Sequence, residues 1–222
     1  GCIKTLKSLK TLSNGIQMAR TLSAKQVLTI KFDTIRLGGG WDECVGEIET
    51  TGIWFIWGNS GNGKTSAVVS LCKELSAFGK VLYNSREEGV SLTMQNTLRR
   101  YGMGELGSRF QLANMSLQEL DEKISQQRSP KFVVLDSFQF MGLTYKDFRA
   151  FCEKHKNKML IFVSRTRGRQ PEGRAAISAM YDASCKIWVE GYKAFSKGRF
   201  VGTTGEMTIW DEGAKKYWSD PI

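Results

Sequence analysis

Residues 52–78 constrain the fold more than any other part of the chain, because an apolar strand, a glycine-rich loop and an apolar-periodic helix follow one another there. The loop fits the pattern G-x-x-x-x-G-K-[ST], whose glycines let backbone N–H groups converge on phosphate oxygens. Lys64 can reach the β- and γ-phosphates of a nucleotide, and the Thr65 hydroxyl can bind Mg²⁺. A triphosphate site at a helix N-terminus is therefore predicted. Its expected nucleotide contacts are Gly58, Asn59, Ser60, Gly61, Asn62, Gly63, Lys64, Thr65 and Ser66.

Acidic residues follow two other expected strands. Asp136 ends an apolar strand over residues 131–136, and a carboxylate there can hold Mg²⁺ through water. The strand over residues 80–84 is followed by Glu87 and Glu88. Ligands of open α/β sheets bind at the carboxyl ends of the strands, where a glutamate can orient an attacking water. We expect Glu87 to take this role, with Glu88 as the alternative.

The rest of the chain alternates short apolar runs with amphipathic segments, which predicts an α/β fold with a mainly parallel sheet. Strands are expected at residues 52–57, 80–84, 131–136 and 158–163, and helices at residues 65–78, 91–101, 116–127 and 145–156. Ser116 with Glu119, and Thr144 with Asp147, are typical of helix capping boxes. After Ser184, glycine-separated β segments indicate antiparallel hairpins at the C-terminal end. They cover residues 186–190, 192–195, 200–202, 207–210 and 216–218.

Composition agrees with one globular domain, since 41% of the 222 residues are hydrophobic and 24% are charged. The longest apolar run, residues 53–57, is far shorter than the ~20 residues of a membrane helix, so no membrane association is expected. No charged start followed by an apolar segment signals export. The five cysteines are widely spaced and His155 is the single histidine, which argues against zinc and favours reduced thiols in the cytoplasm.

Charge is unevenly distributed along the chain. The net charge is +10, and the first 40 residues carry seven Lys or Arg against one Asp. Apolar residues recur every three or four positions between lysines in residues 1–25, which predicts a basic amphipathic helix. We therefore divide the chain into a basic helical or linker segment, residues 1–34, and a globular domain, residues 35–222. A basic end of this kind suits a polyanion partner, and equally it can serve solubility alone.

Three motifs beyond the phosphate loop carry a resemblance to a known family. They are V-L-Y-x-S-x-E-E at residues 81–88, D-S-x-Q at residues 136–139 and K-x-R-F at residues 197–200. In this combination the chain resembles the RecA superfamily of P-loop ATPases, and most closely its RadA/Sms and DnaB-like branch. The resemblance spans roughly residues 35–212. It implies a RecA-like P-loop NTPase core, with helices flanking a mainly parallel sheet and antiparallel β-hairpins at the C-terminal end.

The resemblance also implies ATP hydrolysis with Mg²⁺ and a set of catalytic residues. In the family the first Glu after its strand activates water, the Asp of D-S-x-Q serves the metal, and the Lys and Arg of K-x-R-F reach the γ-phosphate of a neighbouring subunit. Self-association into a ring or filament is therefore expected. One departure is Ser164-Arg165, where family members often place Gly-His or a Gln-bearing sensor. The catalytic residues carried over are Lys64, Glu87, Asp136, Lys197 and Arg199.

Residues 164–174 contain four arginines, two glycines and one proline, which predicts a mobile basic loop. Loops at this position hold single-stranded DNA in RecA-like rings and filaments. An arginine-rich lid over the phosphates, a protein-docking loop and an inert loop are the alternatives. The expected DNA contacts are Arg165, Arg167, Arg169 and Arg174.

Taken with the resemblance, this basic loop favours a DNA-stimulated Mg²⁺-ATPase acting on single-stranded DNA in recombination, repair or replication. A KaiC-like signalling ATPase that ignores DNA and a small-molecule P-loop kinase are the competing hypotheses. The ATPase response to single-stranded DNA separates the first from the other two.

Overall fold

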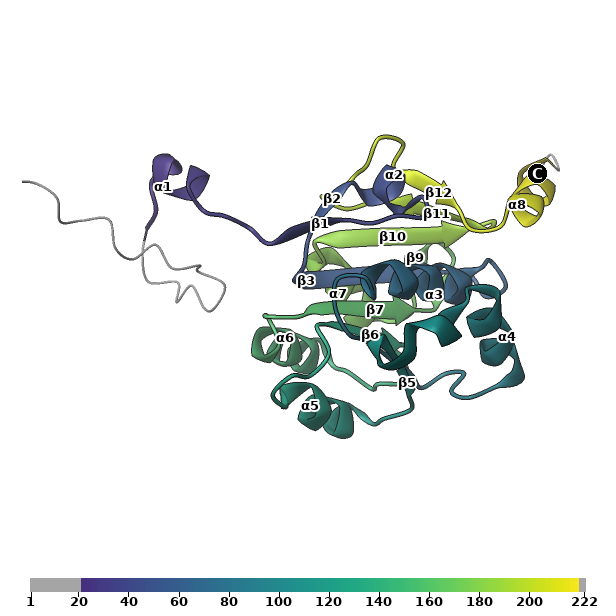
Figure 1. Cartoon of the computed structure of the whole chain (residues 1–222), viewed down its shortest axis with the longest axis horizontal. Helices are drawn as coiled ribbons and strands as arrows, with labels where there is room; N and C mark the ends of the chain where they lie inside the picture. Colours follow the sequence, from purple (N-terminus) through teal and green to yellow (C-terminus); the bar gives the residue numbers. More distant parts are fainter. Residues whose placement is uncertain (1–20, 220–222) are drawn as a thin grey trace, which may run out of the picture.

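The computed structural model describes residues 21–219, and an eight-stranded sheet forms its centre (Figure 1). The strand order is β12-β11-β10-β3-β7-β6-β4-β5. The six strands from β10 to β5 pair in parallel, whereas β11 and β12 add an antiparallel meander to β10. The mainly parallel sheet with antiparallel C-terminal hairpins that the sequence predicts is thus confirmed. The strands are β3 (Gly52–Gly58), β4 (Val81–Ser85), β5 (Phe110–Ala113), β6 (Phe132–Asp136), β7 (Met159–Ser164), β10 (Cys185–Glu190), β11 (Lys193–Ser196) and β12 (Glu206–Thr208).

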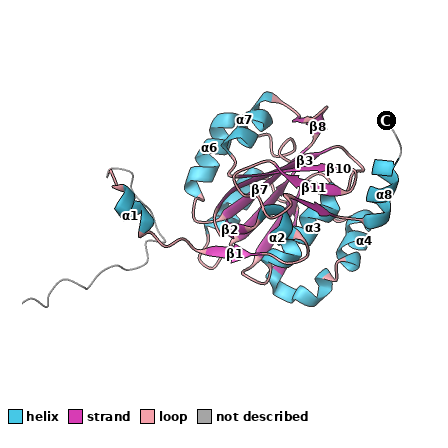
Figure 2. Cartoon of the chain, turned by 90° about the horizontal axis from the view of Figure 1, so that it is seen from above, coloured by secondary structure: helices cyan, strands magenta, loops and turns pink. Residues whose placement is uncertain are grey.

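Helices cover both faces of the sheet, as Figure 2 shows. One face packs against α2 (Trp41–Val45), α3 (Lys64–Leu75) and α4 (Leu92–Arg100), and the other against α5 (Leu117–Ser125), α6 (Tyr145–Lys154) and α7 (Arg174–Asp182). Successive strand residues point to opposite faces, so each central strand supplies both hydrophobic clusters. In β3, Trp54 and Ile56 join the first cluster, whereas Phe55 and Trp57 join the second.

Local sequence signals fix the starts of two of these helices. The Ser116 hydroxyl accepts the Glu119 N–H, and the Glu119 carboxylate accepts the Ser116 N–H at 2.7 Å. The same reciprocal pair joins Thr144 and Asp147 at the start of α6. Both predicted capping boxes are therefore confirmed, and α5 and α6 begin at the residues that follow them.

The N-terminal part of the described chain stands away from the sheet. Helix α1 (Ala24–Leu28) and the residues after it lead to β1 (Thr34–Arg36), which pairs antiparallel with β2 (Glu47–Glu49) (Figure 1). Most of the basic helix predicted for residues 1–25 lies outside the described residues. Between residues 21 and 219, no helix has the length and apolar character needed to cross a membrane.

The C-terminal end corrects two sequence predictions. Residues 216–218, predicted as a strand, belong to helix α8 (Asp211–Ser219), where acidic residues occupy the first turn. The Trp218 indole N–H donates to the Gly191 carbonyl at 3.1 Å. The aromatic residues of α8 therefore pack on the turn after β10 instead of pairing as a strand. Residues 200–202 are not a strand either. The Gly202 N–H instead donates to the Cys44 carbonyl at 3.0 Å and closes the end of α2.

Several further elements carry no recognised sequence signal, among them β5, α7 and a 3-10 segment. Strand β5 is the edge strand beside β4, and a short connection joins it to α5. Helix α7 begins at Arg174, inside the segment predicted as a loop. Between α4 and β5 lies the 3-10 segment η1 (Met103–Arg109).

Candidate nucleotide site

The parallel sheet brings the predicted site residues to one edge. Strand β6 pairs with both β4 and β7, with Asp136 opposite Ser85 and Val163, so the carboxyl ends of these strands coincide. The phosphate loop follows β3, the neighbour of β7. A cavity of about 480 Å³ opens there. It is lined by Ser60, Gly61, Gly63, Lys64, Thr65, Ser66, Glu87, Glu88, Asp136 and Tyr192.

The phosphate loop has the backbone geometry of an anion cradle. Gly61 and Gly63 have positive φ angles of 75° and 92°, which side chains with a Cβ rarely adopt. Lys64 is the first residue of α3, so the cavity lies at that helix's N-terminus. The Lys64 ammonium donates to the Gly58 carbonyl at 3.1 Å. This arrangement fits the phosphates of a nucleotide, which bind where free N–H groups and a helix dipole converge.

Neighbouring strands hold this loop in place. The Asn62 side-chain oxygen accepts the Gly191 N–H at 2.8 Å, and the Asn62 carbonyl accepts the Tyr192 N–H at 3.2 Å. At Gly58 a Cβ would lie 2.1 Å from the Val189 carbonyl oxygen, so only glycine permits β3 and β10 to approach so closely. The turn between β10 and β11 is therefore part of the site, which the sequence did not indicate.

Burial sets the electrostatics of the two central charges. Burial lowers the pKa of Lys64, and the carboxylates of Asp136 and Glu87 oppose that shift. Burial raises the pKa of Asp136 to about 6, although the Tyr83 hydroxyl, which donates to Asp136 Oδ2 at 2.6 Å, works in the opposite direction. A cation brought by a ligand stabilises the charged form of such a buried carboxylate. The site is therefore suited to a positively charged ligand beside Asp136.

Thr65 and Asp136, the two residues expected to hold Mg²⁺, both line the cavity and offer oxygen atoms. In nucleotide sites Mg²⁺ takes one or two protein groups and completes its shell with phosphate oxygens and water. These two residues fit that demand. Within the described part of the chain, no group of three or more His, Cys, Asp or Glu side chains is arranged to hold a metal ion.

The two glutamates after β4 differ in their partners. Glu88 accepts hydrogen bonds from the hydroxyls of Ser91, at 3.0 Å, and Thr93, both at the start of α4. The Glu87 carboxylate instead pairs with Arg165, with 3.0 Å between Oε1 and Nε. Glu88 thus binds two hydroxyls at the start of α4, while Glu87 faces the residues that follow β7.

Lys197 and Arg199 are not brought to this edge. The Lys197 N–H donates to the Lys186 carbonyl and the Arg199 N–H to the Ser184 carbonyl, so both residues lie beside the start of β10. The end of β10 is the part that pairs with Gly58. Four residues of strand, about 13 Å, therefore separate the two places. Both side chains are exposed, and neither lines the nucleotide cavity of its own chain.

The basic segment contains a short hairpin, which corrects the prediction of a loop without strands. Strand β8 (Thr166–Arg167) pairs antiparallel with β9 (Gln170–Pro171). The Thr166 hydroxyl donates to the Asn59 side chain at 2.7 Å, and the Trp57 indole N–H donates to the Arg169 carbonyl at 3.1 Å. These contacts depend on tertiary packing, which composition does not report. Of the four predicted DNA contacts, Arg165 is half-buried, while Arg167, Arg169 and Arg174 are exposed.

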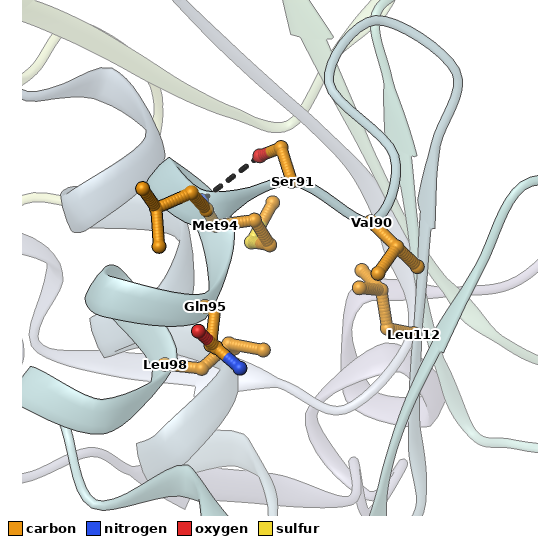
Figure 3. A pocket seen from close by; sticks show the side chains of 7 residues that line it. Val90, Ser91, Met94, Gln95, Leu98 and Leu112 are labelled. Atoms are coloured by element: carbon orange, nitrogen blue, oxygen red, sulfur yellow. Dashed lines mark hydrogen bonds between the residues drawn. The ribbon is translucent and has the colours of Figure 1, made fainter.

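A second cavity, about 460 Å³, lies between α4 and β5 (Figure 3). Its lining contains no ionisable side chain, so it does not resemble a phosphate site. The residues are Val90, Ser91, Leu92, Met94, Gln95, Leu98 and Leu112.

No protein-family model matches the chain, and no curated protein matches its sequence. Among solved structures, it is similar to a KaiC-like protein from the hyperthermophilic archaeon Pyrococcus horikoshii, with a TM-score of 0.57 and 14% identity over 80% of this chain and 99% of that one. It is also similar to the flagellar accessory protein FlaH from Methanocaldococcus jannaschii, with a TM-score of 0.59 and 15% identity over 79% and 90% of the two chains.

Fold and phosphate loop together define a P-loop protein with a RecA-like fold. The two structural similarities confirm the RecA-like fold that the sequence predicts. At 14% and 15% identity they show the fold alone. They do not confirm the finer resemblance to the RadA/Sms and DnaB-like branch.

Proposed function

We propose that this protein binds ATP with Mg²⁺ and hydrolyses it, as a KaiC-like ATPase that assembles with copies of itself. One observation carries the proposal: the positive-φ glycines, Lys64, Thr65, Asp136 and Glu87 converge on a single cavity at the carboxyl edge of the sheet. Phosphoryl transfer to water requires a cation, oxygen atoms that bind a metal, and a carboxylate beside the attacking water. These residues supply all three kinds of group.

Each residue has a role that follows from its position. Lys64 binds the β- and γ-phosphates, and Thr65 and Asp136 hold Mg²⁺, which when bound offsets phosphate charge. Glu87 orients the attacking water and accepts its proton. Lys197 and Arg199 lie too far along β10 to act on their own site, so in this proposal a second copy supplies them.

The proposal favours a KaiC-like ATPase over a DNA-stimulated one for two reasons. Two of the protein's neighbours in structure are a KaiC-like protein and FlaH. In addition, Arg165 is engaged with Glu87, and the hairpin around it is anchored to the nucleotide site. The DNA-stimulated ATPase remains a second candidate, because Arg167, Arg169 and Arg174 are exposed on or next to this hairpin.

Lys64→Ala is expected to weaken ATP–Mg²⁺ binding about 30- to 150-fold, because a buried cation facing phosphate contributes roughly 2–3 kcal/mol. Isothermal titration calorimetry of the purified protein measures this directly. Lys73→Ala, which alters an exposed lysine on the same helix, is the matched control and should leave affinity unchanged. Absence of binding by the unaltered protein, or equal binding by Lys64→Ala, would refute the proposed site.

Steady-state ATP hydrolysis, measured at several protein concentrations with and without single-stranded DNA, separates the candidate functions. We expect the rate per subunit to rise with concentration, because assembly completes the site, and to stay flat with DNA. A DNA stimulation that disappears in Arg167→Ala and Arg169→Ala would favour the DNA-stimulated ATPase instead. Turnover by a monomer that requires an added small-molecule acceptor would favour the kinase.

A further inference from the structure

Arg165 is the residue through which the basic hairpin contacts the nucleotide site. It follows β7 directly, at the position where the sequence departs from the RecA-like pattern. Its Nε donates to Glu87 Oε1 at 3.0 Å, and its guanidinium lies over the Phe140 ring, 4.7 Å from the centroid. The guanidinium is therefore held from two sides, by an ion pair and by a stacking contact.

The backbone around Arg165 is fixed as well. The Arg165 N–H donates to the Gln139 side-chain oxygen at 3.2 Å. The same Gln139 amide donates to the Ser164 hydroxyl at 2.8 Å and to the Glu172 carbonyl at 2.9 Å, on the other side of the hairpin. Gln139 belongs to the D-S-x-Q motif that begins at Asp136. One side chain thus ties both ends of the hairpin to the segment that carries the candidate metal ligand.

The ion pair holds Glu87 while leaving it able to act. Only Nε of Arg165 and Oε1 of Glu87 take part in it. Among the hydrogen bonds of the described residues, Glu87 Oε2 accepts none and the terminal N–H groups of Arg165 donate none. One carboxylate oxygen is thus open to water, and the pair is 36% exposed at Glu87 and 43% at Arg165. The Arg165 charge also lies close enough to Lys64 to help lower the pKa of that amine.

We infer that Arg165 is a positioning residue for hydrolysis, which holds the Glu87 carboxylate at the mouth of the nucleotide cavity and is itself held by Phe140 and Gln139. The inference rests on the proposed function and adds to it the element that orients the water-activating acid. An exposed glutamate on a loop otherwise samples several rotamers, and a displacement of about 1 Å of a catalytic group costs roughly 10²-fold in rate. The hairpin β8–β9 thereby becomes part of the catalytic site's support.

Arg165→Ala is expected to lower kcat about 10- to 100-fold while changing the dissociation constant of ATP less than about threefold. Arg165→Lys restores part of the rate, since a lysine keeps the charge but neither stacks on Phe140 nor donates in the same plane. Phe140→Ala, at a partly exposed ring, lowers kcat by a smaller factor. Arg149→Ala is the matched control, because it breaks another exposed 3.0 Å ion pair, with Asp182, away from the site.

A double-mutant cycle separates positioning from a merely structural role. In a Glu87→Gln background, Arg165→Ala should lower the residual rate less than twofold, because its effect passes through Glu87. A full additional loss in that background, an unchanged kcat in Arg165→Ala, or a loss confined to ATP affinity would overturn the inference. These results differ from failure of the proposed function, which would show as no ATP binding or hydrolysis by the unaltered protein.

Discussion

Replacing Asp136 by asparagine is expected to abolish hydrolysis and, at neutral pH, to make the nucleotide-free protein more stable. Asp136 is 7% exposed, and burial raises its pKa to about 6. A carboxyl whose pKa is higher in the folded than in the unfolded state binds its proton more tightly when folded. Its contribution to stability is therefore complete below about pH 4 and is lost as pH rises through about 6.

The size of the stability change follows from how far burial raises the pKa of Asp136. Raising the pKa of Asp136 from its ordinary value to about 6 corresponds to about 3 kcal/mol of stability lost above pH 6. Asparagine carries no charge, and its side-chain oxygen can still accept the Tyr83 hydroxyl. Without the carboxylate, however, the proposed Mg²⁺ site loses one of its two protein ligands. We therefore expect at least a ~10³-fold loss of kcat, since metal charge stabilisation is worth several kcal/mol.

Denaturant unfolding between pH 4 and pH 8, without nucleotide, measures the stability effect. The unaltered protein should lose stability between pH 4 and pH 6, and Asp136→Asn should lose much less. Asp147→Asn provides a control of opposite sign, because hydrogen bonds with Thr144 lower the pKa of this exposed carboxyl. That control should be less stable than the unaltered protein at neutral pH. A less stable Asp136→Asn at pH 7 would contradict our account of the buried charge.

The parts of the fold that the sequence predicts correctly are those set by neighbouring residues. The strand, glycine loop and helix around Lys64 appear as expected because strand burial, positive-φ glycines and helix start all lie within one short segment. The capping pairs at Ser116 and Thr144 act over three residues and were equally readable. Parallel pairing then explains why Glu87 and Asp136, 49 positions apart in sequence, reach one edge.

The errors arise where distant contacts outweigh local preference. Aromatic residues near Trp218 favour a strand by composition, yet they pack as a helix against the turn at Gly191. The arginine- and glycine-rich segment after β7 has the composition of a free loop, but Asn59 and Trp57 hold it as a hairpin. The contact between Arg165 and Phe140 likewise depends on two loops meeting, which no spacing in the sequence encodes.

Arg199→Ala is expected to lower ATP hydrolysis about 10³-fold or more while leaving ATP binding intact, because an arginine that offsets charge on the transferring phosphoryl group is worth that much in other NTPases. The reason to expect action between subunits is geometric. Arg199 is exposed and lies beside the start of β10, whereas the nucleotide cavity lies at the other end of that strand. Calorimetry gives the affinity and steady-state turnover gives the rate. Arg109→Ala, at another exposed arginine, is the control.

Mixing two inactive variants tests the transfer between subunits most sharply. Lys64→Ala lacks a working phosphate loop but keeps Arg199, whereas Arg199→Ala keeps the loop and lacks the arginine that would reach the neighbouring site. In a mixed assembly, a Lys64→Ala subunit can supply Arg199 to the intact cavity of its neighbour, so activity should reappear on mixing. Because assembly is concentration-dependent, the recovered rate should rise as total protein increases. Two results together would contradict this prediction: no recovery at any ratio or concentration, and an Arg199→Ala variant as active as the unaltered protein. They would show that Arg199 of the K-x-R-F segment does not act on the nucleotide of a neighbouring subunit.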